Sequence, residues 1–278
     1  MSAGLEVRSV SVDYPVRGLT GQGTHRALDA VSVSVPDGAT LGVVGESGSG
    51  KSTLARAILG LVRPSAGEVR WAGERVDFRD RAAMRGYRRA VQVVFQDPVG
   101  SLDPRMTAGA SVAEALTALA GVSSPTEVKA RVDAAFDSVG LDPGFAARYP
   151  HQLSGGQCQR VAIARATVAR PRLLVCDEAV SALDVSVQAQ IVNLLLELRD
   201  RYGLGLLFIS HNLAVVRHVC DRVAVLRAGR LVEEGPASTL FAAPRHPYTR
   251  ALLASVPDPD PVRARAALQQ GPPGAHTV

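Results

Sequence analysis

Gly45-Glu46-Ser47-Gly48-Ser49-Gly50-Lys51-Ser52 decides the fold of this chain, because the stretch matches the phosphate-loop pattern G-x-x-x-x-G-K-[ST] in full. The short apolar segment Thr40 to Val44 before it predicts a strand, and Lys51 to Leu61 after it predicts a helix. Glycines permit positive φ angles and close backbone approach, and the N-terminus of the helix favours an anion. A Gly-rich turn that arose by chance would lack this strand and helix, so the stretch predicts a nucleotide site.

Strands and helices alternate along the rest of the chain, which indicates an α/β core with a largely parallel sheet. The other predicted strands are Leu5 to Val12, Leu28 to Val35, Glu68 to Trp71, Ala90 to Phe95, Leu173 to Asp177 and Leu206 to Ser210. The predicted helices are Thr107 to Val139 with a break at Ser123-Ser124-Pro125, Gly155 to Ala169, a segment with Val187, Ile191, Leu194, Leu195 and Leu198 on one face, and Leu213 to Val219. Arg222 to Leu226 and Arg230 to Glu233 are predicted to form a hairpin.

The composition is typical of a globular protein with an aliphatic core, because 46% of the 278 residues are hydrophobic and only 4% are aromatic. No apolar run approaches the roughly 20 residues that span a bilayer. The segment Met1 to Arg8 lacks the pattern of a signal peptide. We therefore expect a soluble, cytoplasmic chain.

Charge and cysteines give little functional information. The net charge of +5 invites a nucleic-acid interpretation, but the arginines are spread along the chain apart from a modest cluster between Arg79 and Arg89. The three cysteines are far apart and form no metal-ligand spacing; they are Cys158, Cys176 and Cys220. We expect neither a disulfide nor an iron-sulfur cluster.

An acidic pair supplies the candidate catalytic chemistry. The apolar strand that ends at Asp177 would place this carboxylate beside the phosphate loop, where it can hold Mg²⁺, while Ser52 ligates the ion and Lys51 reaches the β- and γ-phosphates. Glu178 would then orient and polarise the attacking water, since positioning and charge stabilisation supply most of the catalysis of phosphoryl transfer. Taken alone, an Asp-Glu pair would be interpreted as a solvated strand end.

The segment Leu153-Ser154-Gly155-Gly156-Gln157 lies between the phosphate loop and this acidic pair. With all three in this order, the chain resembles the ATP-binding cassette (ABC) ATPases. The resemblance implies an α/β fold: a P-loop NTPase core of ABC-ATPase type, with an N-terminal antiparallel β subdomain and an inserted helical subdomain. It also implies that Ser154 and the Gly155 and Gly156 amides close over ATP held by a partner subunit.

The same resemblance implies roles for residues outside these motifs. Gln96 contacts Mg²⁺ or water and senses the membrane partner, and His211 is the switch histidine that bonds the γ-phosphate. Asp184 belongs to the loop 181–184 that couples the two sites, and Tyr14 stacks on adenine. The predicted catalytic residues are Glu178, His211 and Gln96, and the metal ligands are Ser52, Gln96 and Asp177. The residues predicted to bind ATP are Tyr14, Gly45, Ser47, Gly48, Ser49, Gly50, Lys51, Ser52, Thr53, Ser154, Gly155, Gly156, Gln157 and Asp184.

Four further stretches resemble the oligopeptide, dipeptide and nickel importer branch. They are Val94 to Pro98 with Ser101 to Arg105, Tyr149 to Gln157, Ser181 to Ser186 and Pro244 to Thr249. This branch implies an ATP-hydrolysing subunit that is peripheral on the cytoplasmic face of the cell membrane, with peptide favoured over nickel or another solute as cargo. Its implied partners are transmembrane permease subunits, a second and different ABC ATPase chain and, indirectly, an extracytoplasmic solute-binding protein; no nucleic acid is expected.

Two residues of this chain depart from the family pattern. Ala179 replaces the usual Pro after the acidic pair, and Cys158 replaces the usual Arg after the signature. The predicted segments are an ATP-binding core over 1–96, a helical subdomain with the signature over 97–170, the second part of the core over 171–241, and a C-terminal element with a disordered tail over 242–278.

Two other functions remain open at this point. A soluble ABC ATPase that acts on ribosomes or DNA would usually carry two cassettes or a long coiled coil, but this chain has one phosphate loop and no sustained heptads between Gln96 and Leu153. A regulatory nucleotide sensor would not need the hydrolytic residues Glu178 and His211.

We predict that Lys51→Ala weakens ATP binding, because the ammonium group that neutralises the β- and γ-phosphates is removed. Titration of the purified chain with a fluorescent ATP analogue measures this affinity. An unchanged dissociation constant would contradict the role of Lys51.

Overall fold

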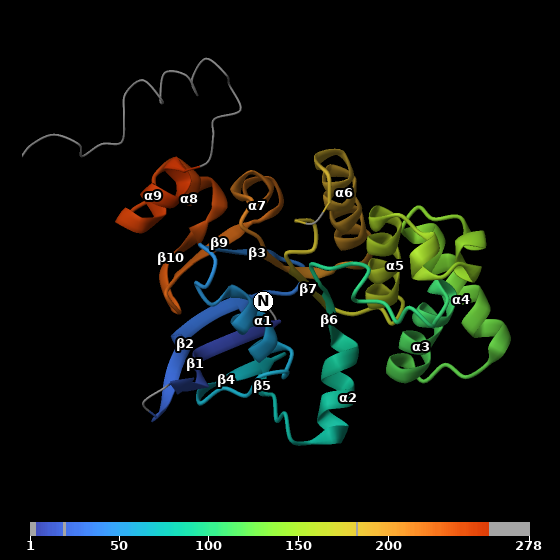
Figure 1. Cartoon of the computed structure of the whole chain (residues 1–278), viewed down its shortest axis with the longest axis horizontal. Coiled ribbons are helices and arrows are strands. Elements are labelled where there is room, and N and C mark those ends of the chain that lie inside the picture. The colour runs from blue at the N-terminus through green and yellow to red at the C-terminus, as the bar shows by residue number, and fades with distance from the viewer. Residues whose placement is uncertain (1–3, 19–20, 182, 256–278) are drawn as a thin grey trace, which may run out of the picture.

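The computed structural model describes residues 4–18, 21–181 and 183–255, which form two β-sheets and the helices that cover them (Figure 1). Ala182 and residues 256–278, which make up most of the predicted disordered tail, lie outside the described residues. Within the described ranges, no helix is both long enough and apolar enough to cross a membrane.

The larger sheet has six strands in the order β10-β9-β3-β8-β7-β6. Its strands are β3 (Thr40–Val44), β6 (Val91–Val94), β7 (Leu173–Asp177), β8 (Gly205–Ile209), β9 (Arg222–Arg227) and β10 (Arg230–Pro236). All neighbours pair in parallel except β9 and β10, which form the predicted antiparallel hairpin. Because the strands are parallel, the segments that follow β3, β6, β7 and β8 emerge at one edge, where open α/β sheets bind ligands.

The smaller sheet is antiparallel and has the order β2-β1-β4-β5. It comprises β1 (Leu5–Gly18), β2 (Gly21–Val35), β4 (Ala66–Trp71) and β5 (Glu74–Arg75). β1 and β2 are much longer than the predicted strands, and register shifts interrupt their pairing between Val7 and Asp13. Ser9 and Ala30 have positive φ angles near these shifts, as β-bulges require.

Helices cover both faces of the larger sheet. They are α1 (Lys51–Ile58), α2 (Arg81–Ala90), α3 (Ala108–Ala120), α4 (Pro125–Ser138), α5 (Gly155–Thr167), α6 (Val185–Tyr202), α7 (Leu213–Val219), α8 (Ala237–Ala242) and α9 (Pro247–Ala254). Two short 3₁₀ turns, Pro143–Ala147 and Pro150–Gln152, precede α5. In Figure 1, α3, α4 and α5 lie together beyond β6, at one end of the molecule.

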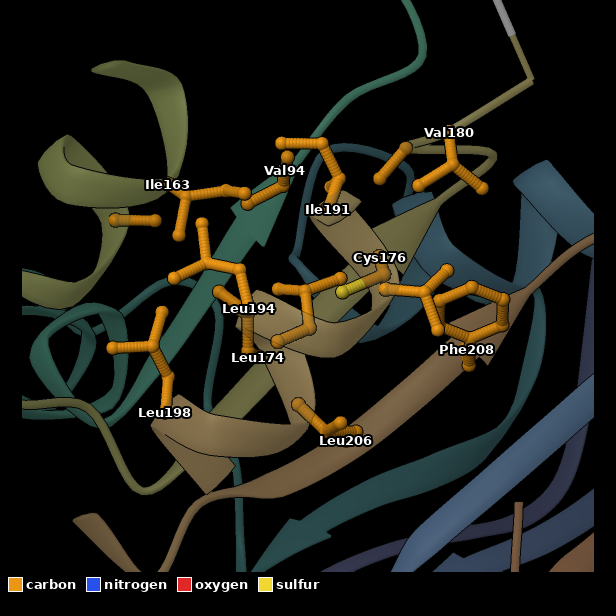
Figure 2. Close-up of a cluster of buried hydrophobic side chains, with 14 of the residues drawn as sticks. Val94, Ile163, Leu174, Cys176, Val180, Ile191, Leu194, Leu198, Leu206 and Phe208 are labelled. Atoms are coloured by element: carbon orange, nitrogen blue, oxygen red, sulfur yellow. The ribbon is translucent and has the colours of Figure 1, made fainter. Parts of the chain in front are cut away.

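The core has two parts because the strands of the larger sheet are buried on both faces. Leu174 and Leu206 point toward Ile191 of α6 and its neighbours on one face (Figure 2). Leu173 and Val175 point the other way and pack with α1 and the antiparallel sheet. This two-sided burial explains the continuous apolar sequence of these strands, which is typical of parallel sheets.

The predicted fold class is confirmed by this arrangement of two sheets and helices. β3, β7 and α7 have the bounds that the sequence predicts. The predicted break is present: α3 ends at Ala120 and α4 begins at Pro125. The first helix was predicted to run to Leu61 but ends at Ile58, because Gly60 takes a left-handed φ of 71°. Helices α2, α8 and α9 were not predicted.

We predict that Leu206→Ala destabilises the fold by about 2–5 kcal/mol, because Leu206 of β8 is fully buried between the neighbouring strands β3 and β7, in the same core cluster as α6, and its truncation leaves a cavity. Leu61→Ala is the matched control, since Leu61 is 61% exposed and its loss should change stability by about 0.5 kcal/mol or less. Urea unfolding followed by circular dichroism measures both. Equal midpoints for the two variants would contradict the assigned core.

Candidate functional site

The phosphate loop joins the end of β3 to the start of α1, and its glycines are required by their surroundings. A Cβ atom on Gly45 would lie 2.2 Å from the carbonyl oxygen of Leu226, and one on Gly50 would lie 2.8 Å from that of Ala27. Gly48 and Gly50 also have φ angles of 77° and 106°, which other residues rarely adopt. The loop therefore lies directly against the β9–β10 hairpin and β2.

Lys51 is buried at the base of this loop. Its ammonium group donates hydrogen bonds to the carbonyl oxygens of Gly45 and Glu46, both at 2.8 Å. Burial lowers the pKa of Lys51, whereas the nearby charges of Glu178 and Asp177 act in the opposite direction. The ammonium group thus faces both the loop and the acidic pair.

Asp177 ends β7 beside the first turn of α1. Its Oδ1 accepts a hydrogen bond from the Ser52 hydroxyl at 3.2 Å, so these two predicted metal ligands meet. Burial raises the pKa of the Asp177 carboxyl, and the Ser52 hydrogen bond opposes that shift.

The oxygen donors of Ser52 and Asp177 fit Mg²⁺ bound by one or two protein groups plus substrate phosphates. Among the described residues, no group of three or more His, Cys, Asp or Glu side chains is arranged to hold a metal by itself. A magnesium ion here would therefore depend on phosphate oxygens for most of its ligands.

Glu178 and His211 face each other at the ends of the neighbouring strands β7 and β8. His211 Nδ1 lies 3.6 Å from Glu178 Oε1. The Glu178 backbone has a left-handed φ of 52°, and its N–H donates to the carbonyl oxygen of Ile209 at 2.9 Å. A left-handed residue other than glycine costs about 1–2 kcal/mol, so the fold maintains this orientation against local strain.

The signature segment begins α5 and is a self-contained cap. The Gln157 N–H donates to Ser154 Oγ at 3.2 Å, while the Ser154 N–H donates to Gln157 Oε1 at 2.9 Å. Gly155 and Gly156, which follow Ser154, form the first turn of the helix. Figure 1 shows α5, which begins with the signature, well separated from α1, which follows the phosphate loop.

The remaining predicted residues lie around this sheet edge. Gln96 follows β6 and is exposed, and Thr53 lies in the first turn of α1. Asp184 caps α6 by accepting the N–H of Val187 at 2.9 Å, and this hydrogen bond lowers its pKa. Ser47 is exposed, whereas Ser49 is buried and its carbonyl oxygen accepts a hydrogen bond from Gly229 N–H.

Tyr14 lies on β1 with its ring against the second core cluster. Its hydroxyl is buried and, among the described residues, has no hydrogen-bond partner. Adenine stacking by Tyr14 stays a prediction.

The two departures from the family pattern are both buried. The carbonyl oxygen of Ala179 accepts a hydrogen bond from the side-chain amide of Gln159 at 2.6 Å. Cys158 packs inside α5 with its Sγ 3.5 Å from the carbonyl oxygen of Pro150, and burial raises the pKa of its thiol. Cys158 therefore belongs to helix packing.

Sequence reasoning missed two residues that contact the site. Gln159 is fully buried and connects α5 to the segment after Glu178; a polar residue on an apolar helix face was the available signal. Tyr248 of α9 accepts a hydrogen bond from the backbone N–H of Glu46, inside the phosphate loop, at 3.1 Å. No sequence signal connects these two positions, which lie 202 residues apart.

The sequence matches two family models. Residues 28–181 match the model described as "ABC transporter", and residues 232–277 match that of the "Oligopeptide/dipeptide transporter, C-terminal region".

Named relatives and solved structures agree with these matches. The oligopeptide transport ATP-binding protein OppF of Escherichia coli K12 is 52% identical over 86% of this chain and 71% of its own length. The glutathione import ATP-binding protein GsiA of Pectobacterium atrosepticum is 47% identical over 93% of this chain and 42% of its own length. A solved ATP-binding cassette, a dimer in a post-hydrolysis state bound to ADP and phosphate, is 30% identical with a TM-score of 0.74, over 84% of this chain and 98% of that one.

We predict that Gly45→Ala displaces the phosphate loop and weakens nucleotide binding, because its Cβ would overlap the Leu226 carbonyl oxygen. Gly73→Ala is the matched control: Gly73 also has a positive φ, 85°, but a Cβ there would meet no atom of the described residues within 4 Å. Calorimetric titration with ATP compares the two variants. Wild-type affinity in Gly45→Ala would show that the loop is not fixed by this contact.

Proposed function

Because this chain belongs to the ABC transporter family of ATPases, we propose that it couples ATP binding and hydrolysis at a two-cassette interface to the uptake of peptides, or of a related small solute, through a partner permease. Its similarity to the oligopeptide/dipeptide C-terminal region and to peptide import ATP-binding proteins supports the peptide cargo. The arrangement of the site supports the two-cassette interface.

The observation that carries this proposal is the separation of the signature from its own phosphate loop. Lys51, Asp177, Glu178 and His211 gather at one sheet edge, whereas Ser154 lies at the start of the distant helix α5. A second cassette would bring its signature over this loop. The dimeric form of the solved cassette structure described above supports such an arrangement.

The residues of the sheet edge divide the reaction between them. The loop N–H groups and Lys51 bind the phosphates, and Ser52 with Asp177 would hold Mg²⁺, which neutralises developing charge on the phosphates. Glu178 orients the attacking water, and His211, 3.6 Å from it, holds that carboxylate and the γ-phosphate in place. Such preorganised polar groups lower the barrier because they need no rearrangement as charge develops.

The proposed partners follow from the importer branch. Transmembrane permease subunits bind this chain at the cytoplasmic face of the membrane, a second cassette of a different chain completes the two ATP sites, and an extracytoplasmic solute-binding protein delivers the cargo. Affinity purification of the tagged chain from gently solubilised membranes tests this assembly. Recovery of two permease subunits and a second cassette supports it; recovery of ribosomes or nucleic acid, or of this chain alone, contradicts it.

We predict that Glu178→Gln retains ATP binding but loses about 10²–10³-fold in turnover, because the charge that polarises the water is removed. The control is Glu74→Gln on the exposed strand β5, which should hydrolyse ATP like the wild type. Phosphate release under saturating MgATP measures both. Near-normal turnover in Glu178→Gln would remove this residue from its proposed role.

A further inference from the structure

The segment after β10 reaches back to the phosphate loop through the buried Tyr248. Tyr248 lies in the first turn of α9 and is only 6% exposed. Its hydroxyl accepts the N–H of Glu46 at 3.1 Å. The proposed function assigns no role to this C-terminal contact.

The hydrogen bond fixes one particular peptide unit. The carbonyl oxygen of Gly45 and the N–H of Glu46 belong to the same planar group. Lys51 donates to that carbonyl at 2.8 Å, and the N–H donates to Tyr248 on the other side. Both polar ends of this peptide are therefore bound, and its orientation sets where the Lys51 ammonium group lies.

The Gly45–Glu46 peptide needs support from outside the loop because its first residue is glycine. Gly45 has a φ of 151°, and the glycine backbone has more accessible rotations than any other. The carbonyl oxygen of Leu226 leaves no room for a Cβ atom at position 45. A residue with a more restricted backbone therefore cannot replace Gly45. A hydrogen bond from a rigid neighbour restricts the rotation instead.

Tyr248 is held rigidly enough to serve as that neighbour. The Glu233 carboxylate of β10 accepts the backbone N–H groups of Arg245 at 2.9 Å and His246 at 3.0 Å. His246 Nδ1 then accepts the Tyr248 N–H at 3.1 Å and caps α9. The Arg227 guanidinium lies 4.8 Å from the centre of the Tyr248 ring.

We propose that Tyr248 is a positioning residue for the phosphate loop, and that the C-terminal element acts on ATP binding by fixing the Gly45–Glu46 peptide through it. This inference rests on the proposed ATP site. When only a fraction of loops has the binding orientation, the apparent dissociation constant rises by the reciprocal of that fraction. By this contact, α9 keeps most phosphate loops in the binding orientation.

The test is Tyr248→Phe, which removes the hydroxyl and keeps the ring. Loss of one neutral hydrogen bond should raise the dissociation constant and KM for MgATP about three- to tenfold, with kcat within about twofold of the wild type. Hydrogen exchange of the Glu46 amide should become faster. Tyr202→Phe, at the exposed end of α6, is the control and should change none of these quantities.

A double-mutant cycle tests the route through α9. Glu233→Gln should weaken ATP binding in the wild-type background but have little further effect in Tyr248→Phe, because residues that act as one unit are not additive. Fully additive effects would overturn the role of the Glu233 support.

The outcomes separate the two proposals. Failure of the wild-type chain to bind MgATP would remove the proposed function itself. Wild-type binding together with unchanged affinity and amide exchange in Tyr248→Phe would overturn only the role of Tyr248. So would a lower unfolding temperature in that variant with normal affinity in its folded fraction, because the hydroxyl would then serve packing alone.

Discussion

The parallel register of β3, β7 and β8 determines which side chains lie together at the candidate site. Asp177 pairs with Ile209, and Val43 pairs with Ile209 on the other side, so the chain leaves all three strands at the same level. The phosphate loop, the acidic pair and His211 therefore lie close together at the carboxyl edge of the sheet. A shift of one residue in β7 would turn Asp177 away from Ser52 and expose the apolar residues that now face both halves of the core.

The site combines this register with local strain and close packing. Glu178 is held in a left-handed conformation by its hydrogen bond to Ile209, and Gly45 is pressed against Leu226. Both features depend on neighbouring strands rather than on the loops themselves. The candidate site is therefore positioned by the sheet rather than by its loops alone. The helix α5 packs on α3 and α4, and its signature residues lie at its start rather than at the phosphate loop, although Gln159 connects the helix to Ala179 beside Glu178.

Much of this architecture could be predicted because its signals are local. β7 is a short apolar run that ends at a carboxylate, and the glycine loop follows β3 directly. Helix α2 gave no such signal: it buries only Met84 and Tyr87, and it depends on the Asp80 cap and on the bond from the Tyr87 hydroxyl to the Ile58 carbonyl oxygen. The left-handed backbone of Glu178 and the contact between α9 and the phosphate loop arise from the assembled fold, so periodicity and spacing could not indicate them.

The reciprocal cap at the start of α5 bears on the proposed contact between two cassettes. Ser154 Oγ already accepts the Gln157 N–H, which fixes the side chain while leaving the hydroxyl hydrogen free to donate. A partner would thus contact a segment that is already ordered, and little conformational entropy would be lost there. In the proposed two-cassette interface, such contacts could form and break repeatedly without any refolding of the signature.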